Sequence, residues 1–314
     1  MSGLDDDFPP LRAAAGAARG FLQVLVRRLE LERREAGLRF RIDLDGDEPA
    51  LLGNADKRRA AARIDVDEGR ALEAALEEFR REARPGERRI LEGRDFRFRH
   101  ASGGALVLVP SADGGGPEPL LFERDIPPVG WNLANGASSS LDELADLDAV
   151  IAREAAEELI VLDPEARRLH PLGPARGGDE IARALALWGE RLGAAPGAPL
   201  APTPIAGPDV LEVRLPDGRV GRTEGLFVDL QAEDFGLEAS RGLRLDVDLG
   251  RRVPLDGELR GETDLLDRRV ATFAAPPPAA PARQWRSGRR DAGAGPTLRA
   301  CPAAAKILAR LAVS

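Results

Sequence analysis

Apolar positions in the first 94 residues predict an α+β segment. Between residues 11 and 35 they recur at near-helical intervals, which predicts an amphipathic helix carrying Phe21, Leu22, Leu25, Leu29 and Leu31. Residues 38–44 alternate apolar and charged side chains, which is the period of a half-buried strand. A second helix is predicted around residues 72–83 and ends at Pro85-Gly86. No pattern in this segment indicates chemistry.

From residue 96 the pattern changes to that of strands and then to that of one long helix. Strands are predicted at 96–99, 104–109 and 120–124, and the last two are expected to form a hairpin. A Gly/Ser/Asn loop at 130–140 leads into a continuous helix over residues 141–162. Apolar residues repeat there every three or four positions, at Leu144, Leu147, Ile151, Ala155, Leu159 and Leu162. We expect this stripe to pack against a mixed sheet.

In the rest of the chain, segments with a helical spacing of apolar residues alternate with segments that have the spacing of a strand. A helix is predicted at 179–192, and residues 193–208, which contain five prolines, are expected to form an irregular insertion. Strands are predicted at 210–215, 225–230 and 243–249, followed by a Pro/Ala linker at 274–282 and a helix at 303–311. The predicted organisation is an N-terminal extension (1–94), a central α/β domain (95–273) and a C-terminal tail (274–314).

The charge balance limits the class of partner. The chain has 45 Lys and Arg against 53 Asp and Glu, a net charge of -8, which argues against nucleic acid because phosphate backbones need a clustered positive surface. The N-terminus is acidic where a signal peptide would be basic, and no apolar run is long enough to span a bilayer. We therefore expect a soluble, cytoplasmic protein with no membrane partner.

Cysteine and histidine are too rare to support most metal or redox frameworks. A single Cys and two His exclude a disulfide framework and disfavour a Cys/His zinc site. Cys301 is expected to be a buried structural residue. His100 and His170 are interpreted as structural histidines in preference to general bases.

The strongest indication of chemistry is an acidic stretch within the predicted helix 141–162. Glu154, Glu157 and Glu158 stand at positions i, i+3 and i+4, so their carboxylates share one face and repel one another. A hard divalent cation bound through oxygen would make that arrangement favourable. Arg153 precedes Glu157 by one turn and is expected to hold its carboxylate. The alternative is a solvated acidic helix face.

With the loop that precedes it, this stretch resembles the signature of the Nudix hydrolases, G-x5-E-x7-R-E-U-x-E-E-x-G-U, in which U is a bulky aliphatic residue. Trp131 to Gly136 stands where that family has a tryptophan and a glycine turn, and Arg153, Glu154, Glu157 and Glu158 match its catalytic helix. The resemblance implies a Nudix-type α/β/α sandwich with a mixed sheet over residues 95–273. It also implies Mg²⁺ or Mn²⁺ on the glutamates and a nucleotide pyrophosphate as substrate.

The chain departs from the signature at three places. Between Gly136 and Arg153 it has three residues too many, so the isolated motif glutamate matches either Glu143 or Asp142. Glu143 also fits a capping box with Ser140, in which it would close the helix N-terminus. Ile160 stands where the family has glycine, which removes the usual helix end. Ala155 replaces a larger aliphatic residue.

On this resemblance the roles divide into catalysis, metal binding and substrate binding. Arg153, Glu154, Glu157 and Glu158 are the expected catalytic residues, and Glu143 joins the three glutamates as a metal ligand. Substrate binding is assigned to Gly136, as a turn, and to Arg124 and Trp131. Downstream, Asp246, Asp248, Asp256 and Glu258 are weaker candidates for a further carboxylate.

Two other functions compete with a pyrophosphohydrolase. A non-catalytic Nudix-like module would bind a nucleotide or a partner protein, which the altered spacing and Ile160 favour. A structural protein with a solvated acidic helix would bind no divalent cation. The sequence does not determine the leaving group of the reaction or the oligomeric state of the protein, and a homodimer is one of the states it allows.

Overall fold

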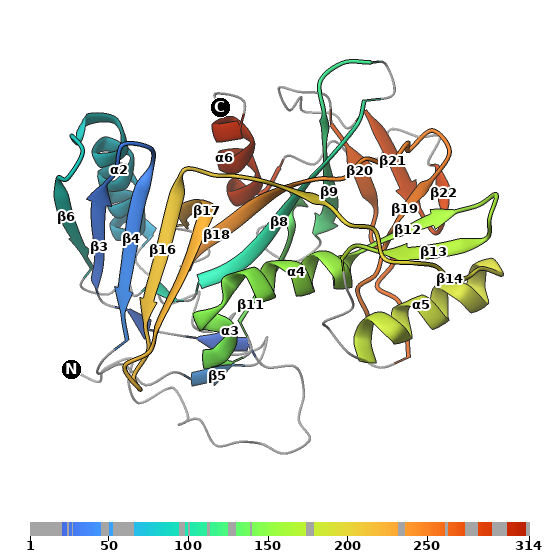
Figure 1. Cartoon of the computed structure of the whole chain (residues 1–314), viewed down its shortest axis with the longest axis horizontal. Helices are drawn as coiled ribbons and strands as arrows, with labels where there is room; N and C mark the ends of the chain where they lie inside the picture. The colour runs from blue at the N-terminus through green and yellow to red at the C-terminus, as the bar shows by residue number, and fades with distance from the viewer. Residues whose placement is uncertain are drawn as a thin grey trace. The chain divides into compact units, whose positions relative to one another are not determined.

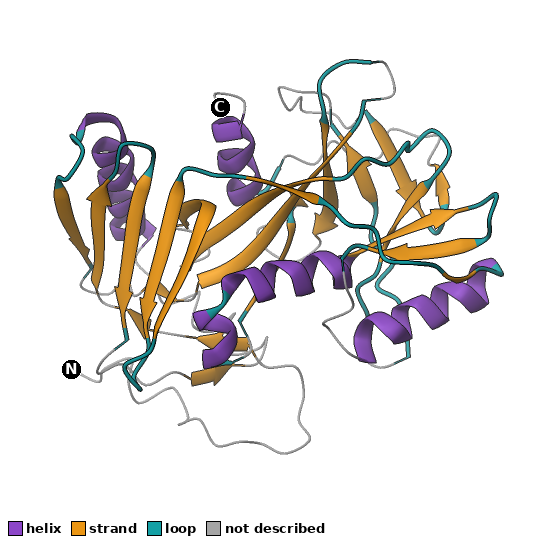
Figure 2. Cartoon of the chain, viewed as in Figure 1, coloured by secondary structure: helices purple, strands orange, loops and turns teal. Residues whose placement is uncertain are grey.

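The chain is a mixed α/β protein in which strands predominate over helices (Figure 2). The computed structural model describes residues 21–44, 50–52, 66–93, 98–124, 130–173, 179–231, 236–273, 282–290 and 300–311, apart from 24, 27, 100, 112–113, 139 and 261–262. His100 and residues 274–281 of the expected linker lie outside the described residues.

The described residues form two compact units that interleave along the chain, and the limits of these units differ from the domain boundaries predicted at residues 94 and 273. Unit 1 comprises Met1–Gly103, Gly136–Val150 and Ala206–Ala239. Unit 2 comprises Gly104–Asn135, Ile151–Ile205 and Ser240–Ser314.

Unit 1 contains a run of five hydrogen-bonded strands in the order β17-β16-β4-β3-β6. Their bounds are β17 Val220–Gln231, β16 Asp209–Arg214, β4 Leu38–Asp43, β3 Arg28–Arg33 and β6 Arg88–Glu92. β16 is parallel to β4 and the other pairs are antiparallel. Helix α2 (Val66–Glu82) contacts β6 and β17 (Figure 1). The strands predicted at 38–44, 210–215 and 225–230 and the helix predicted at 72–83 are confirmed.

The helix expected over residues 11–35 is wrong for its described part. Residues Phe21–Gln23 and Leu25–Val26 are the short strands β1 and β2, and β3 follows. Within β3 the apolar positions Leu29 and Leu31 are two apart and fully buried, while Glu30 lies on the other face. A spacing of two places both leucines on one face of a strand, and pairing with β4 and β6 decides the conformation.

Unit 2 contains a second run of strands in the order β22-β21-β20-β9-β8, with β10 also paired to β9. Their bounds are β22 Arg289–Arg290, β21 Arg283–Arg286, β20 Val270–Thr272, β9 Glu118–Arg124, β8 Ala101–Val109 and β10 Gly130–Asn132. β8 and β9 pair antiparallel with Val107 opposite Leu120, so the expected hairpin is confirmed.

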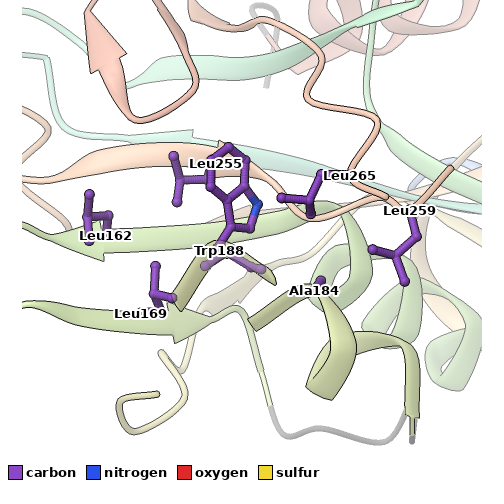
Figure 3. Packing of buried hydrophobic residues seen from close by; sticks show 8 residues of the cluster. Leu162, Leu169, Ala184, Trp188, Leu255, Leu259 and Leu265 are labelled. Atoms are coloured by element: carbon purple, nitrogen blue, oxygen red, sulfur yellow. The ribbon is translucent and has the colours of Figure 1, made fainter. Parts of the chain in front are cut away.

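A separate four-stranded sheet in unit 2 has the order β14-β13-β12-β19. Its bounds are β14 Ala195–Pro196, β13 Arg168–Pro171, β12 Leu159–Asp163 and β19 Val253–Asp256. Helix α5 (Asp179–Leu192), predicted from the sequence, packs against β13 and β14. Figure 3 shows the α5 residue Trp188 among Leu162, Leu169, Leu255, Leu259 and Leu265, all of them buried. This core fixes β12 and β19 beside each other.

The single helix expected over residues 141–162 is wrong. Helix α3 (Leu141–Ala145) ends at Asp146, helix α4 runs over Leu147–Glu158, and strand β12 begins at Leu159. Asp146 leaves the helical conformation at φ -130° and ψ 80°, and its Oδ1 accepts a hydrogen bond from Ala149 N. The predicted apolar stripe is nevertheless buried, since Leu144 and Ile151 are each 2% exposed.

The remaining elements are short. The insertion at 193–208 contains two strands, β14 and β15 (Thr203–Ile205), so it is less irregular than expected. Of the strand predicted at 243–249, only the first two residues are in a strand, because β18 (Gly236–Arg244) ends at Arg244. The others are β5 Ala50–Leu52, β7 Phe98–Arg99, β11 Ala134–Ala137 and the expected terminal helix α6 Pro302–Leu311. Among the described helices, none has the length and apolarity needed to cross a membrane.

Candidate acidic site

Helix α4 delivers three glutamates to the place where it changes into strand β12. Glu154 and Glu158 are buried, and the Glu157 side chain is 16% exposed. Strand β12 follows Glu158 directly and pairs with β19, so that Leu159 lies opposite Asp256. The register of this pair therefore places the C-terminal end of α4 beside the C-terminal end of β19.

The end of strand β19 and the tight loop after it add two more carboxylates. Gly257 N donates a 2.9 Å hydrogen bond to Glu158 O, and a Cβ atom at Gly257 would lie 2.3 Å from Glu157 O. Only glycine fits so close to the helix backbone. Asp256 and Glu258 flank it. We call Glu154, Glu157, Glu158, Asp256 and Glu258 the acidic cluster.

Arg153 bonds the first part of the acidic cluster. Its Nη1 lies 2.7 Å from Glu154 Oε1 and 3.0 Å from Glu157 Oε2. The contact with Glu157 one turn ahead confirms the pairing expected from the sequence. Both of these contacts are made by the same nitrogen, Nη1.

Arg268 bonds the second part of the acidic cluster. Its Nη2 lies 2.9 Å from Asp256 Oδ1, 3.0 Å from Glu158 Oε2 and 2.9 Å from Glu258 Oε2. Asp256 also accepts hydrogen bonds from Arg268 N at 2.8 Å and from Arg268 Nε at 3.0 Å. The guanidinium lies over the ring of Phe122, 5.5 Å from its centroid.

Burial and mutual repulsion favour protonation in the acidic cluster. Burial raises the pKa of the Glu154 carboxyl to about 8; Glu157 and Glu258 add to the rise and Arg153 opposes it. Burial also raises the pKa of Glu158 well above its usual range, against the attraction of Arg268. For Arg268 burial acts to lower the pKa, but Glu158, Asp256 and Glu258 outweigh it and keep the guanidinium charged. Ionisation of Glu154 and Glu158 is therefore unfavourable in the arrangement described here.

The donor chemistry of the acidic cluster suits a hard divalent cation, because every ligand atom it offers is a carboxylate oxygen. In the part of the chain that the structure describes, no three Asp, Glu, His or Cys side chains are already arranged to hold a metal ion. Arg153 and Arg268 hold the carboxylates in the arrangement described here. A metal-bound form therefore requires some of these ion pairs to rearrange.

The structure places Glu143 and its alternative Asp142 in helix α3. Ser140 Oγ accepts a 3.2 Å hydrogen bond from Glu143 N, which confirms that Ser140 caps this helix. The Asp142 carboxylate bonds Arg219 Nη1 at 2.7 Å. A metal role for Glu143 stays a prediction.

The three residues expected to bind substrate lie in strands. Gly136 is inside β11 and has no left-handed conformation, so the expected turn there is wrong. Trp131 is fully buried in β10, and its ring packs edge-on against Phe273 with centroids 5.5 Å apart. Arg124 closes β9 opposite Gly130. Trp131 thus contributes to the core of unit 2, and the substrate contacts of all three stay predictions.

Of the weaker candidates, Asp256 and Glu258 join the cluster. Asp248 accepts a hydrogen bond from Gly250 N at 2.7 Å, and His170 Nδ1 lies 2.8 Å from Ala198 O. Cys301 is buried, as expected. Sequence reasoning missed Arg268 and Gly257. Gly257 carried a signal, since the dipeptide Asp256-Gly257 marks a turn.

Comparison of this chain with family models, curated proteins and solved structures gives no match. What the acidic cluster does is therefore inferred from its own side chains.

Proposed function

We propose that the acidic cluster binds Mg²⁺ or Mn²⁺ and that the protein hydrolyses a pyrophosphate bond in a nucleoside diphosphate joined to another group. The observation that carries this proposal is the meeting of five carboxylates, from α4, the end of β19 and the loop after it, around the guanidinium groups of Arg153 and Arg268. Ionising the buried Glu154 and Glu158 beside these neighbours is costly, and a bound divalent cation would offset that cost.

Glu154, Glu157 and Glu158 are the proposed metal ligands, with Glu258 within electrostatic reach of Glu154 and Glu158. A bound divalent cation would polarise the phosphoryl oxygen and lower the pKa of a water molecule. Arg153 holds Glu154 and Glu157 at a fixed separation, and Glu154 would give up its proton on loading. These residues supply position and charge. Water would attack one phosphorus atom, and the bond from that atom to the bridging oxygen would break, so that the other phosphate leaves with that oxygen.

The Nudix-type α/β/α arrangement of residues 95–273 belongs to the same proposal. The order of elements supports it: the hairpin β8–β9 precedes helix α4, and β12 follows that helix. The match of Arg153, Glu154, Glu157 and Glu158 to the Nudix helix supports it as well. The break at Asp146 and the strand that begins immediately after Glu158 depart from one continuous helix.

A second candidate function is binding of a nucleotide or a partner without hydrolysis. Arg268 favours it, because this guanidinium contacts Glu158, Asp256 and Glu258 in the way that a resident cation would. A cluster neutralised by an arginine has less need of a metal.

A substrate screen separates the two functions. Nucleotide sugars, ADP-ribose-like compounds, dinucleotides and damaged nucleoside triphosphates are incubated with the full chain, with and without Mg²⁺ or Mn²⁺, and products are separated by chromatography. We expect metal-dependent cleavage of at least one class, slowed roughly a hundredfold or more by Glu157→Gln. Binding of a compound without any product would instead establish the second candidate.

A further inference from the structure

One nitrogen of the Arg268 guanidinium lies close to more carboxylates than it can bond at the same time. Nη2 carries two hydrogens, yet it lies within 3.0 Å of oxygen atoms from Glu158, Asp256 and Glu258. At most two of these contacts can be well-directed hydrogen bonds at once. The third is held mainly by charge.

Asp256 is the fixed partner among the three. Its side chain is fully buried and accepts hydrogen bonds from Arg268 N, Nε and Nη2. Its other contact, from Glu258 N at 3.2 Å, fixes the loop on which Glu258 stands. Arg268 is thus anchored through Asp256 whatever Glu158 and Glu258 do.

Glu158 and Glu258 are the exchangeable partners. Each meets Arg268 at Nη2 alone, and the Glu258 side chain is 37% exposed. A carboxylate oxygen that bonds a guanidinium cannot at the same time be fully available to a metal ion. The positive charge of Arg268 also repels a cation that approaches the same oxygens.

We propose that Arg268 is an internal competitor of the divalent cation: it shares Glu158 and Glu258 with the metal and thereby sets the affinity of the acidic cluster for it. This inference rests on the proposed function, because it requires that the cluster bind a metal. Arg268 acts as a positioning residue through Glu158 and Glu258. It stays bound to Asp256 in both states.

The test is calorimetric titration of the full chain with Mn²⁺. Arg268→Gln removes the competing charge, and we expect its Mn²⁺ affinity to rise roughly tenfold or more over wild type. Arg268→Lys keeps the charge but loses the planar fork, so a smaller gain is expected. Arg269→Gln is the matched control: this neighbour is about as buried but bonds Glu123 and Gln284, and its affinity should equal that of wild type.

Thermal unfolding supplies a readout independent of activity. Without metal, Arg268→Gln should melt below wild type, because Asp256 and Glu158 lose their partner, and Mn²⁺ should raise its melting temperature by more than it raises that of wild type. If Arg268→Gln does not fold, Arg268→Lys alone must show the gain in affinity.

Two results would overturn the inference, and they differ in what they say of the proposed function. If wild type binds Mn²⁺ and neither Arg268 variant binds it more tightly, Arg268 is no competitor, while the metal site stands. If neither wild type nor a folded Arg268 variant binds Mn²⁺, the inference and the proposed function both fail.

Discussion

Gly257 lies directly against the last turn of helix α4, where its backbone N donates a 2.9 Å hydrogen bond to Glu158 O. Together with the pairing of Leu159 and Asp256, this contact brings the end of β19 and the following Glu258 to the glutamates of α4. The site is therefore built by a backbone approach as much as by its charged side chains.

Replacing Gly257 by alanine should destabilise the fold and disturb the acidic cluster together. The added Cβ would lie 2.3 Å from Glu157 O and 3.2 Å from the Ile160 side chain, so the loop must move. We expect a loss of about 1–3 kcal/mol in the free energy of unfolding, measured by chemical denaturation. Gly116→Ala is the control, because nothing lies within 4 Å of a Cβ there. Equal stability of the two variants would contradict the close approach.

Ile151 should be essential to the packing of helix α4. Its side chain is 2% exposed, so Ile151→Asp would bury an unpaired charge and lower the free energy of unfolding by several kcal/mol. Ile90→Asp makes the same change at a position that is 44% exposed and should cost far less. Denaturation curves of both variants test the assignment, which fails if Ile151→Asp is tolerated as well as Ile90→Asp.

The stability of the metal-free protein should depend on pH through Glu154. Its pKa is about 8 in the folded chain against a usual 4.5, so its contribution to stability is fully present below about pH 4.5 and is lost as the pH rises through 8. Glu154→Gln has no such proton to lose. The variant should therefore gain stability relative to wild type over this range, by on the order of a few kcal/mol at pH 8.

The measurement is the free energy of unfolding of both proteins at pH 5, 7 and 8, with a chelator present. Glu190→Gln, on the exposed face of α5, controls for the loss of a glutamate. A constant difference between wild type and Glu154→Gln across the three pH values would show that Glu154 is not held protonated.

Much of the fold follows from local patterns in the sequence. The apolar residues of helix α2 and of strands β16 and β17 have clear helical and strand-like spacings. Turn residues follow the helix and separate the two strands. The contact between Arg153 and Glu157 could be predicted because both stand on one helix, one turn apart. Each of these relationships joins residues that are close in sequence.

The sequence predictions are wrong where pairing with residues far away in the sequence decides the conformation. The run Leu159 to Leu162 fits a buried helix or a buried strand equally well, and β13 and β19 make it a strand. Asp146 can continue a helix or cap a new one, and only its position in the fold decides. Arg268 stands 110 residues after Glu158 along the chain, so no local spacing could associate the two.

The most direct test of the central claim is a calorimetric titration of Mn²⁺ into wild type, Glu157→Gln and the control Glu190→Gln at one pH. The glutamine at 157 keeps the size of the side chain while removing a charge from the acidic cluster. We expect saturable binding to wild type and to the control, and binding weakened roughly tenfold or more in Glu157→Gln. No saturable binding to wild type, or equal binding by all three proteins, would contradict the assignment of a divalent cation to this site.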